Sequence, residues 1–480
     1  ILMSELIARG KGKTILVVTV KSMMTQFQQE MWNRFTVPLV RLDSRRIQRI
    51  RAEIPTNHNP FYYYDRTIVS MDTLKRDVEY RTHLENAWWD IIVIDEAHNV
   101  ATRGNRQAQR ARLAELLAKR SDTLIMLSAT PHDGRSESFA SLMNMLDSTA
   151  IANPEKYTKE EIKGLCIRRF KKDVQDQVRG AFQERKITIE KSKASANEES
   201  AFQVFTEIQL AMDEKGRGGS QLFKTTLEKS MFSSPAACIK SINERIRRTE
   251  KNADSADLKD IQALTRLRDA LEEIKPQDFS RYTQLVKLLE CPEYGWDKHD
   301  REDRIVIFTE RIETMKYVAE QLEENLKLQK NAIQTLHGGM TDSEQQRIVE
   351  EFGRTESPLR ILVASDVASE GINLHYLSHR LIHFDIPWSL MVFQQRNGRI
   401  DRYGQTKNPD IRYMMTESAN EKIKGDLRIL EILIEKEEQA HKNIGDPAIL
   451  MGVFDQMEEE LVTAQAIEKG INPEDFASSL

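Results

Sequence analysis

Short apolar runs separated by helix-length polar stretches dominate the first third of the chain. The runs are rich in Ile and Val and lie at residues 14–18, 38–42, 67–70, 90–94 and 123–127. This pattern is typical of parallel strands that are covered on both faces of a sheet. The sequence therefore predicts a first α/β lobe over residues 1–160.

A second set of apolar runs lies at residues 304–308, 334–337, 360–364 and 380–384. The segment TDSE, from Thr341 to Glu344, has the form of a capping box and predicts the start of a helix between two of these strands. A second α/β lobe is therefore expected over residues 291–412.

The segment between the lobes has helical periodicity instead. Apolar residues recur at helical spacing in two sets, Ala201, Phe205, Ile208 and Met212, and Leu258, Ile261, Leu264, Leu267, Leu271 and Ile274. We predict an α/β fold with two parallel-sheet lobes, a linking element (161–194), an all-helical insertion (195–290) and a helical C-terminal tail (413–480).

Composition limits the possible functions. The 70 Lys and Arg residues nearly balance the 75 Asp and Glu residues, so a nucleic-acid site must be local rather than a property of the whole surface. Cys166, Cys238 and Cys291 lie far apart, which argues against a disulfide framework or a thiolate zinc site. No apolar run of about 18 residues occurs, so we expect a soluble, cytoplasmic protein without membrane contact.

The strongest chemical signal is VIDEAHNV, residues 93–100, where an apolar strand runs directly into two carboxylates. Side chains at the carboxyl end of a parallel strand stand over the crevice in which such sheets bind ligands. There, Asp95 would hold a nucleotide-bound Mg²⁺ through water, and Glu96 would activate the attacking water. The alternative is a strand that ends in a solvated acidic turn.

Three further motifs follow in order: LSATP (127–131), ASDVASEGINL (364–374) and QQRNGRIDRYGQ (394–405). Ser128 and Thr130 are expected to hydrogen-bond the acidic loop and report the nucleotide state. Arg399 and Arg402 are predicted to share one face of a helix. A guanidinium that reaches a γ-phosphate stabilises the charge that develops in phosphoryl transfer. The alternative is a surface helix with two solvated arginines.

Together these motifs resemble superfamily 2 helicases and translocases, and most closely their Swi/Snf-type branch with its bacterial RNA-polymerase-recycling and phage-defence members. LCIRRFKKDV (165–174), FSSPAA (232–237) and RYGQ (402–405) carry the closer likeness. The resemblance implies that both parallel-sheet lobes are RecA-like and that the basic 165–174 element is a hinge between lobes. A solvated basic helix is the alternative.

The resemblance also implies roles for single residues. Nucleotide contacts fall on His98, Gly371, Asn373 and Gln395. Contacts to the nucleic-acid strand along which such a motor moves fall on Thr19, Lys21, Ser22, Ser70, Asp72, Ser365 and Asp366. The family usually has proline where this chain has Val20, so the first strand-contacting loop departs from the family pattern.

GKGKT, residues 10–14, looks like a phosphate loop but has the wrong context. A working loop follows a strand and opens a helix, whereas GKGKT follows a helix-like segment and enters a strand. The resemblance implies that the true loop lies upstream of Ile1. This chain alone is then expected not to bind ATP tightly or hydrolyse it.

The sequence thus predicts an ATP- and Mg²⁺-dependent translocase on double-stranded DNA. Two alternatives stay open: a strand-separating DNA or RNA helicase, and an ATPase-dead nucleic-acid clamp. Antiviral-defence partners or RNA polymerase are possible contexts implied by the resemblance.

Overall fold

The computed structural model describes residues 1–75, 78–102, 109–128, 136–158, 160–167, 183–208, 210, 219–250, 255–366, 372–402, 404–443 and 456–479. The chain divides into two compact units. The first comprises the described residues up to 167, and the second the described residues from 183 onward. Each is considered by itself.

The first unit is a five-stranded parallel sheet in the order β2-β3-β1-β4-β5. The predicted strands are all present. Its elements are α1 (Leu2–Ala8), β1 (Ile15–Thr19), η1 (Lys21–Met23), α2 (Met24–Phe35), β2 (Val40–Leu42), α3 (Ser44–Glu53), η2 (Pro60–Tyr62), β3 (Arg66–Ser70), α4 (Met71–Lys75), α5 (Val78–Glu85), β4 (Trp89–Ile94), η3 (Ala97–Val100), α6 (Gln109–Ala118), β5 (Ser121–Met126) and α7 (Ser136–Leu146).

The second unit is built on a six-stranded parallel sheet in the order β6-β11-β10-β7-β9-β8. The expected capping box of Thr341 and Glu344 is present at α15. The sheet elements are β6 (Lys186–Lys193), β7 (Ile305–Thr309), α14 (Ile312–Leu326), β8 (Ile333–Leu336), α15 (Asp342–Phe352), β9 (Ile361–Ser365), β10 (Arg380–His383), α17 (Leu390–Asn397) and β11 (Asp410–Glu417).

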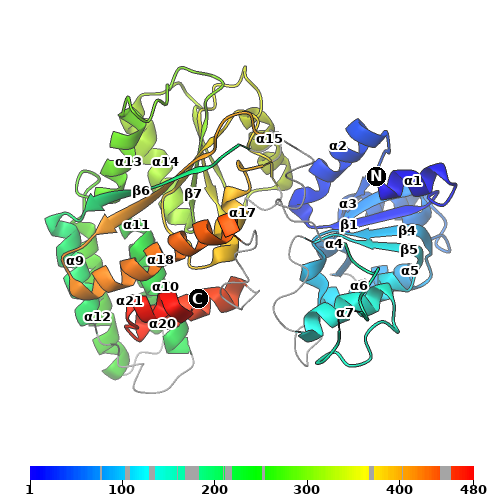
Figure 1. Ribbon diagram of the computed structural model, residues 1–480, viewed down its shortest axis with the longest axis horizontal. Helices are drawn as coiled ribbons and strands as arrows, with labels where there is room; N and C mark the ends of the chain where they lie inside the picture. The colour runs from blue at the N-terminus through cyan, green and yellow to red at the C-terminus, as the bar shows by residue number, and fades with distance from the viewer. Residues whose placement is uncertain are drawn as a thin grey trace. The chain divides into compact units, whose positions relative to one another are not determined.

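Two predicted boundaries fall inside this sheet. All eight residues of β6 pair in parallel with β11, and Figure 1 shows the two strands side by side. Residues 186–193 are therefore sheet rather than linker, and residues 413–417 are strand rather than helical tail. Both strands alternate apolar and charged residues only weakly, so no clear apolar run marked them in the sequence.

The segment after β6 is helical, as predicted: α9 (Ala196–Glu207), α10 (Gly219–Ser233), α11 (Pro235–Thr249), α12 (Ser255–Glu272) and α13 (Ser280–Glu290). Leu264, Leu267 and Leu271 are buried along α12, but Leu258 at its start is 54% exposed. The predicted apolar face is thus correct from Ile261 to Leu271, whereas Leu258 is exposed and Ile274 lies beyond the end of the helix. Pro276 follows the end of α12, as expected for a residue that cannot continue a helix.

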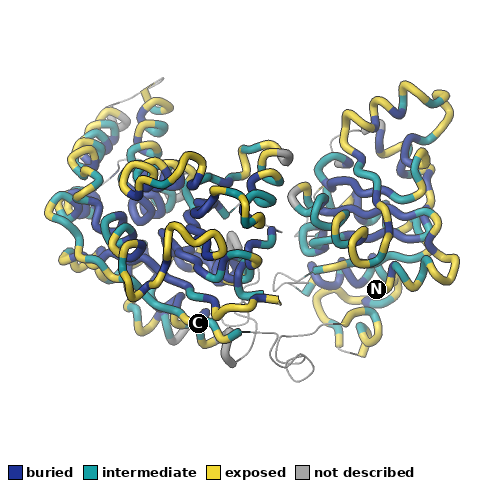
Figure 2. The backbone as a smooth tube through the Cα atoms, turned by 90° about the horizontal axis from the view of Figure 1, so that it is seen from above, coloured by how far each residue is buried: buried dark blue, intermediate teal, exposed yellow. Residues whose placement is uncertain are grey.

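The tail consists of α18 (Glu421–Asn443), α20 (Gln456–Glu468) and α21 (Pro473–Ser479). Its apolar side chains, among them Leu430, Ile434 and Ile467, join the same core as the helical insertion and one face of the second sheet. Figure 2 shows the buried residues concentrated in the interior of each unit, with exposed residues around them. Among the described residues, no helix combines the length and apolar character that crossing a membrane requires.

Two buried carboxyl groups make the second unit sensitive to pH. The pKa of Glu228 in α10 and that of Asp426 in α18 are each raised to about 7, mainly by burial, and the charge of Asp426 contributes to the rise at Glu228. In the unfolded chain both groups ionise near pH 4, so the unfolded state holds fewer protons between about pH 4 and 7. The unfolding free energy is therefore expected to fall as pH rises through this window.

The double variant Glu228→Gln/Asp426→Asn is expected to flatten this dependence and to raise the unfolding free energy at pH 8 by roughly 3 kcal/mol. Urea unfolding of the whole chain between pH 5 and 8, with hydrogen exchange of the α10 and α18 amides, measures the effect. Glu290→Gln, at an exposed position of the same unit, is the control. Equal pH slopes for the double variant and the parent would contradict the prediction.

Candidate functional site

The polar residues predicted in the first unit meet at one edge of its sheet. Thr19 is paired with Ser70 in the register of β1 and β3, and Val18 is paired with Ile94 in the register of β1 and β4. Since all the strands are parallel, Asp95 after β4 and Ser128 after β5 leave the sheet at this same edge. The topology therefore brings the two first-unit motifs together.

Asp95 is held at this edge by the strand beside it. The buried Thr19 hydroxyl donates to Asp95 Oδ2 at 3.0 Å, and the Asp95 N–H donates to the Val18 carbonyl at 2.9 Å. Burial raises the pKa of Asp95, while hydrogen bonds from Thr19 and from the Glu96 N–H lower it. A partly desolvated carboxylate of this kind is suited to binding a cation.

Glu96 adopts a left-handed backbone conformation, with φ 49° and ψ 49°. This conformation costs a non-glycine residue on the order of 1–3 kcal/mol, and residues that adopt it cluster at functional sites. The next backbone N–H, that of Ala97, donates to the Leu127 carbonyl at 2.8 Å. The acidic loop is thus tied to the segment that follows β5.

His98 joins the side chains of the two loops. Its Nδ1 lies 3.2 Å from Ser128 Oγ and 3.3 Å from Glu96 Oε2. The predicted contact of Ser128 with the acidic loop is therefore present, and its role in reporting nucleotide state remains a prediction. Thr130 lies outside the described residues.

The first unit fits a hydrated magnesium ion better than a directly caged one. The described residues contain no cluster of three His, Cys, Asp or Glu side chains able to hold a metal ion. Mg²⁺ commonly keeps several waters and binds through one or two carboxylates together with substrate phosphates. A single carboxylate at Asp95 matches that mode.

The residues of the first unit that are predicted to contact a nucleic-acid strand differ in burial and in their partners. Lys21, in η1, is exposed. Ser70 is buried, and its Oγ accepts from the Thr73 N–H at 3.1 Å in a local turn. Asp72 pairs with Arg110 at 2.8 Å. The side chain of Ser22 is outside the part of the chain that the structure describes.

The structure confirms the local context predicted for GKGKT. The segment follows α1 and leads into β1. The N–H groups of Lys13 and Thr14 both donate to Asp90 Oδ2, at 2.6 and 2.9 Å. These amides hold the start of the sheet and are not directed to a ligand at the start of a helix.

In the second unit, an arginine that the sequence analysis did not select occupies the corresponding edge. Arg396, on α17, has a fully buried side chain and binds both oxygens of Asp366, with Nε–Oδ1 at 2.5 Å and Nη2–Oδ2 at 2.7 Å. Asp366 directly follows β9. The neighbouring Ser365 is buried, and its Oγ has no hydrogen-bond partner among the described residues.

Asp385, which follows β10, extends this network. Its Oδ1 lies 3.5 Å from Arg396 Nη2, and its Oδ2 accepts from Thr309 Oγ1 and from Ser233 Oγ, both at 2.6 Å. Ser233 belongs to the FSSPAA segment of the helical insertion. The insertion is thus hydrogen-bonded directly to the polar edge of the second sheet.

The predicted helical placement of Arg399 and Arg402 is wrong. Helix α17 ends at Asn397, and both arginines lie in the turn that follows, so they do not share a helix face. Arg399 Nη1 donates to the Ile372 carbonyl at 3.3 Å, and Arg402 Nη1 donates to Asn373 Oδ1.

The remaining two predicted nucleotide contacts are less defined. Gln395 is half-buried on α17. Gly371 lies outside the described residues. The second unit therefore brings together three of the predicted residues: Asn373, Arg399 and Arg402.

Two family models match the chain. A SNF2-related domain matches residues 2–241, which is half of the chain, and a helicase conserved C-terminal domain matches residues 280–404. The chain belongs to the SNF2-related family. The acidic loop falls within the first match, and Arg396, Arg399 and Arg402 fall within the second.

Curated relatives of this SNF2-related chain include the uncharacterized ATP-dependent helicase YqhH of Bacillus subtilis, which is 24% identical over 93% of the chain and 73% of the relative. The RNA polymerase-associated protein RapA of Vibrio cholerae is 24% identical over 84% of the chain and 43% of the relative. The chain thus spans less than half the length of RapA.

Solved structures similar to the SNF2-related chain include the Sulfolobus solfataricus SWI2/SNF2 ATPase core in complex with dsDNA. It is 19% identical, covers 98% of the chain and 87% of that structure, and has a TM-score of 0.33. The Pyrococcus furiosus Hef helicase domain is 14% identical, with coverages of 86% and 94% and a TM-score of 0.46.

Sequence reasoning about this SNF2-related chain missed Arg396 and Asp385. A signal for Arg396 was present, because it lies three and four residues after Phe393 and Val392 and so shares the buried face of a helix. A charged residue on a buried face requires a buried partner. The identity of the partners, 30 and 11 residues away, was not readable from spacing.

Proposed function

We propose that this chain is the motor of an ATP-dependent translocase that moves along double-stranded DNA in the cytoplasm. One observation carries the proposal: in a chain of the SNF2-related family, Asp95 and Glu96 lie at the carboxyl edge of a parallel sheet, and His98 links Glu96 to Ser128. This is an arrangement suited to phosphoryl transfer.

In this proposal the acidic loop performs the chemistry on the γ-phosphate. Asp95 binds the hydrated Mg²⁺ that accompanies ATP, and this ion supplies neutralisation of phosphate charge. Glu96 orients the attacking water and accepts its proton. His98 lies within reach of the Glu96 carboxylate and helps to fix its direction.

The second unit supplies positive charge. We propose that Arg399 and Arg402 stabilise the charge that develops on the transferred phosphoryl group, and that Gly371, Asn373 and Gln395 contact the nucleotide. The contact between Arg402 and Asn373 supports a common site. Arg396 serves a different purpose, since its guanidinium is enclosed by two carboxylates.

DNA contacts are proposed for Lys21, Ser22 and Ser365. Hydroxyl groups and a lysine bind phosphates without regard to base sequence, which suits a protein that moves along DNA. Four other predicted contacts are left out because other side chains or N–H groups engage them: Thr19 by Asp95, Ser70 by Thr73, Asp72 by Arg110 and Asp366 by Arg396.

The proposed function predicts that DNA stimulates ATP hydrolysis by the complete protein and that ATP drives displacement of a third strand from a DNA triplex. A forked duplex should not be unwound, because a translocase on duplex DNA tracks a strand without separating the pair. Unwinding of the fork would favour the helicase alternative, and DNA binding without ATP turnover would favour a clamp. The defence and RNA-polymerase contexts remain predictions.

A further inference from the structure

Helix α17 has an unusual setting for a helix of eight residues. It carries Gln395, and it leads directly into the turn that holds Arg399 and Arg402. The Arg399 N–H donates to the Arg396 carbonyl at 3.1 Å, so the backbone of Arg399 is bonded to the last turn of the helix.

A carboxylate from the C-terminal tail caps the start of α17. Glu459, on α20, is fully buried. Its Oε2 accepts from Ser389 Oγ at 2.5 Å and from the Met391 N–H at 3.0 Å. Ser389 Oγ in turn accepts from the Val392 N–H. Helix α20, 70 residues away along the chain, thus provides a partner for the N–H groups and the positive dipole end at the start of α17.

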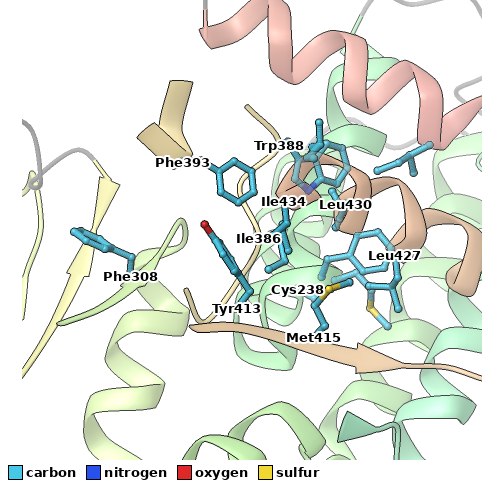
Figure 3. Packing of buried hydrophobic residues seen from close by; sticks show 14 of the residues in the cluster. Cys238, Phe308, Ile386, Trp388, Phe393, Tyr413, Met415, Leu427, Leu430 and Ile434 are labelled. Atoms are coloured by element: carbon cyan, nitrogen blue, oxygen red, sulfur yellow. The ribbon is translucent and has the colours of Figure 1, made fainter. Parts of the chain in front are cut away.

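The same face of α20 makes further contacts with the residues that precede α17. Thr463, one turn after Glu459, donates from Oγ1 to the Trp388 carbonyl at 2.9 Å. Lys229 of the helical insertion lies over the Trp388 ring and pairs with Glu460. Figure 3 shows Trp388 and Phe393 near Leu430 and Ile434 of the tail, and all four belong to one core.

The opposite end of α17 is held by the second sheet. Asn397, the last helical residue, donates from Nδ2 to the hydroxyl of Tyr413 in β11 at 3.1 Å. A second tail glutamate, Glu437 on α18, binds both terminal nitrogens of Arg185 at 3.0 and 2.9 Å. The tail therefore holds α17 at its start, through the buried polar bonds of Glu459.

The stability of the fold alone does not explain why a carboxylate is buried at the position of Glu459. Glu459 Oε1 is buried with no hydrogen-bond partner among the described residues. Burial raises the pKa of Glu459 to about 7, which marks the cost of keeping its charge there. Well-packed apolar residues commonly replace buried ionic groups without loss of stability. What the carboxylate adds is a directional bond that fixes where the helix starts.

We propose that Glu459 is a positioning residue, through which the C-terminal tail sets the place of α17 and so of Arg399 and Arg402. The inference rests on the proposed ATPase function. Its physical basis is that a displacement of about 1 Å in a group that stabilises the transition state can lower the rate by about 100-fold.

The test uses the complete protein with saturating double-stranded DNA. Glu459→Ala is expected to lower kcat for ATP hydrolysis about tenfold or more, with KM for ATP changed less than about twofold. Glu459→Gln keeps an oxygen that accepts from Ser389 and Met391, so it should restore kcat to within about threefold of the parent. Hydrogen exchange in Glu459→Ala should rise at residues 390–393 and stay unchanged in β7 and β9.

Glu468→Ala is the matched control, because Glu468 lies on the same helix in a partly exposed pair with Lys224, and its kcat should equal that of the parent. The proposal is overturned if Glu459→Ala keeps the parental kcat, if glutamine does not rescue it, or if exchange rises equally throughout the sheet. If the parent protein itself does not hydrolyse ATP, the proposed function fails instead.

Discussion

Replacing Glu96 with glutamine in the complete protein is expected to lower kcat for ATP hydrolysis by at least about 100-fold, because general-base catalysis contributes typically 10²–10⁴-fold. Glutamine has nearly the same shape but cannot accept a proton from water. The affinity for ATP should change less than about threefold, since Asp95 and its bond from Thr19 remain. Steady-state turnover and a titration with fluorescent nucleotide separate the two effects.

Glu155→Gln provides the matched control, because Glu155 is an exposed glutamate of the same unit. Its kcat is expected to stay at the parental value. A Glu96→Gln protein that turns over ATP within about threefold of the parent would remove Glu96 from the proposed catalytic role, given the usual size of a general-base effect.

Arg396→Met is expected to lower the unfolding free energy of the second unit by about 3–5 kcal/mol, the usual effect of breaking a buried ion pair by removing one partner. The Arg396 side chain is fully buried between Asp366 and Asp385, so its removal leaves two enclosed carboxylates without a cation. Urea unfolding of the whole chain measures the loss.

The deficit caused by Arg396→Met should shrink as pH falls. Burial raises the pKa of Asp366 and Arg396 lowers it, so without the arginine this pKa rises further and the carboxyl group is neutralised at a higher pH.

The control variant is Arg347→Met, at a site 59% exposed on α15, which should lower the unfolding free energy by less than about 0.5 kcal/mol. The double variant Arg396→Met/Asp366→Asn should recover part of the loss. A loss of unfolding free energy below about 1 kcal/mol in Arg396→Met would show that the ion pairs of Arg396 with Asp366 and Asp385 do not stabilise the second unit as proposed.

Where sequence prediction succeeded, the signal was local. The apolar runs located the strands of both sheets except β6 and β11. VIDEAHNV located Asp95 and Glu96 at a strand end. The left-handed backbone conformation of Glu96 was not predicted from any sequence pattern. Motif order was enough to select Arg399 and Arg402, but helical spacing placed them on a helix that in fact ends two residues before Arg399.

The amino-acid sequence by itself determined two parallel α/β lobes, a helical insertion and an acidic loop at a strand end. It could do so because strand and helix periodicities are local, and parallel strands necessarily bring their carboxyl ends to one edge. Only the tertiary structure decided the long-range pairings. Ser389 meets Glu459 across 70 residues, and Arg185 meets Glu437 across 252. Such partners depend on how the elements pack, and no spacing along the chain encodes them.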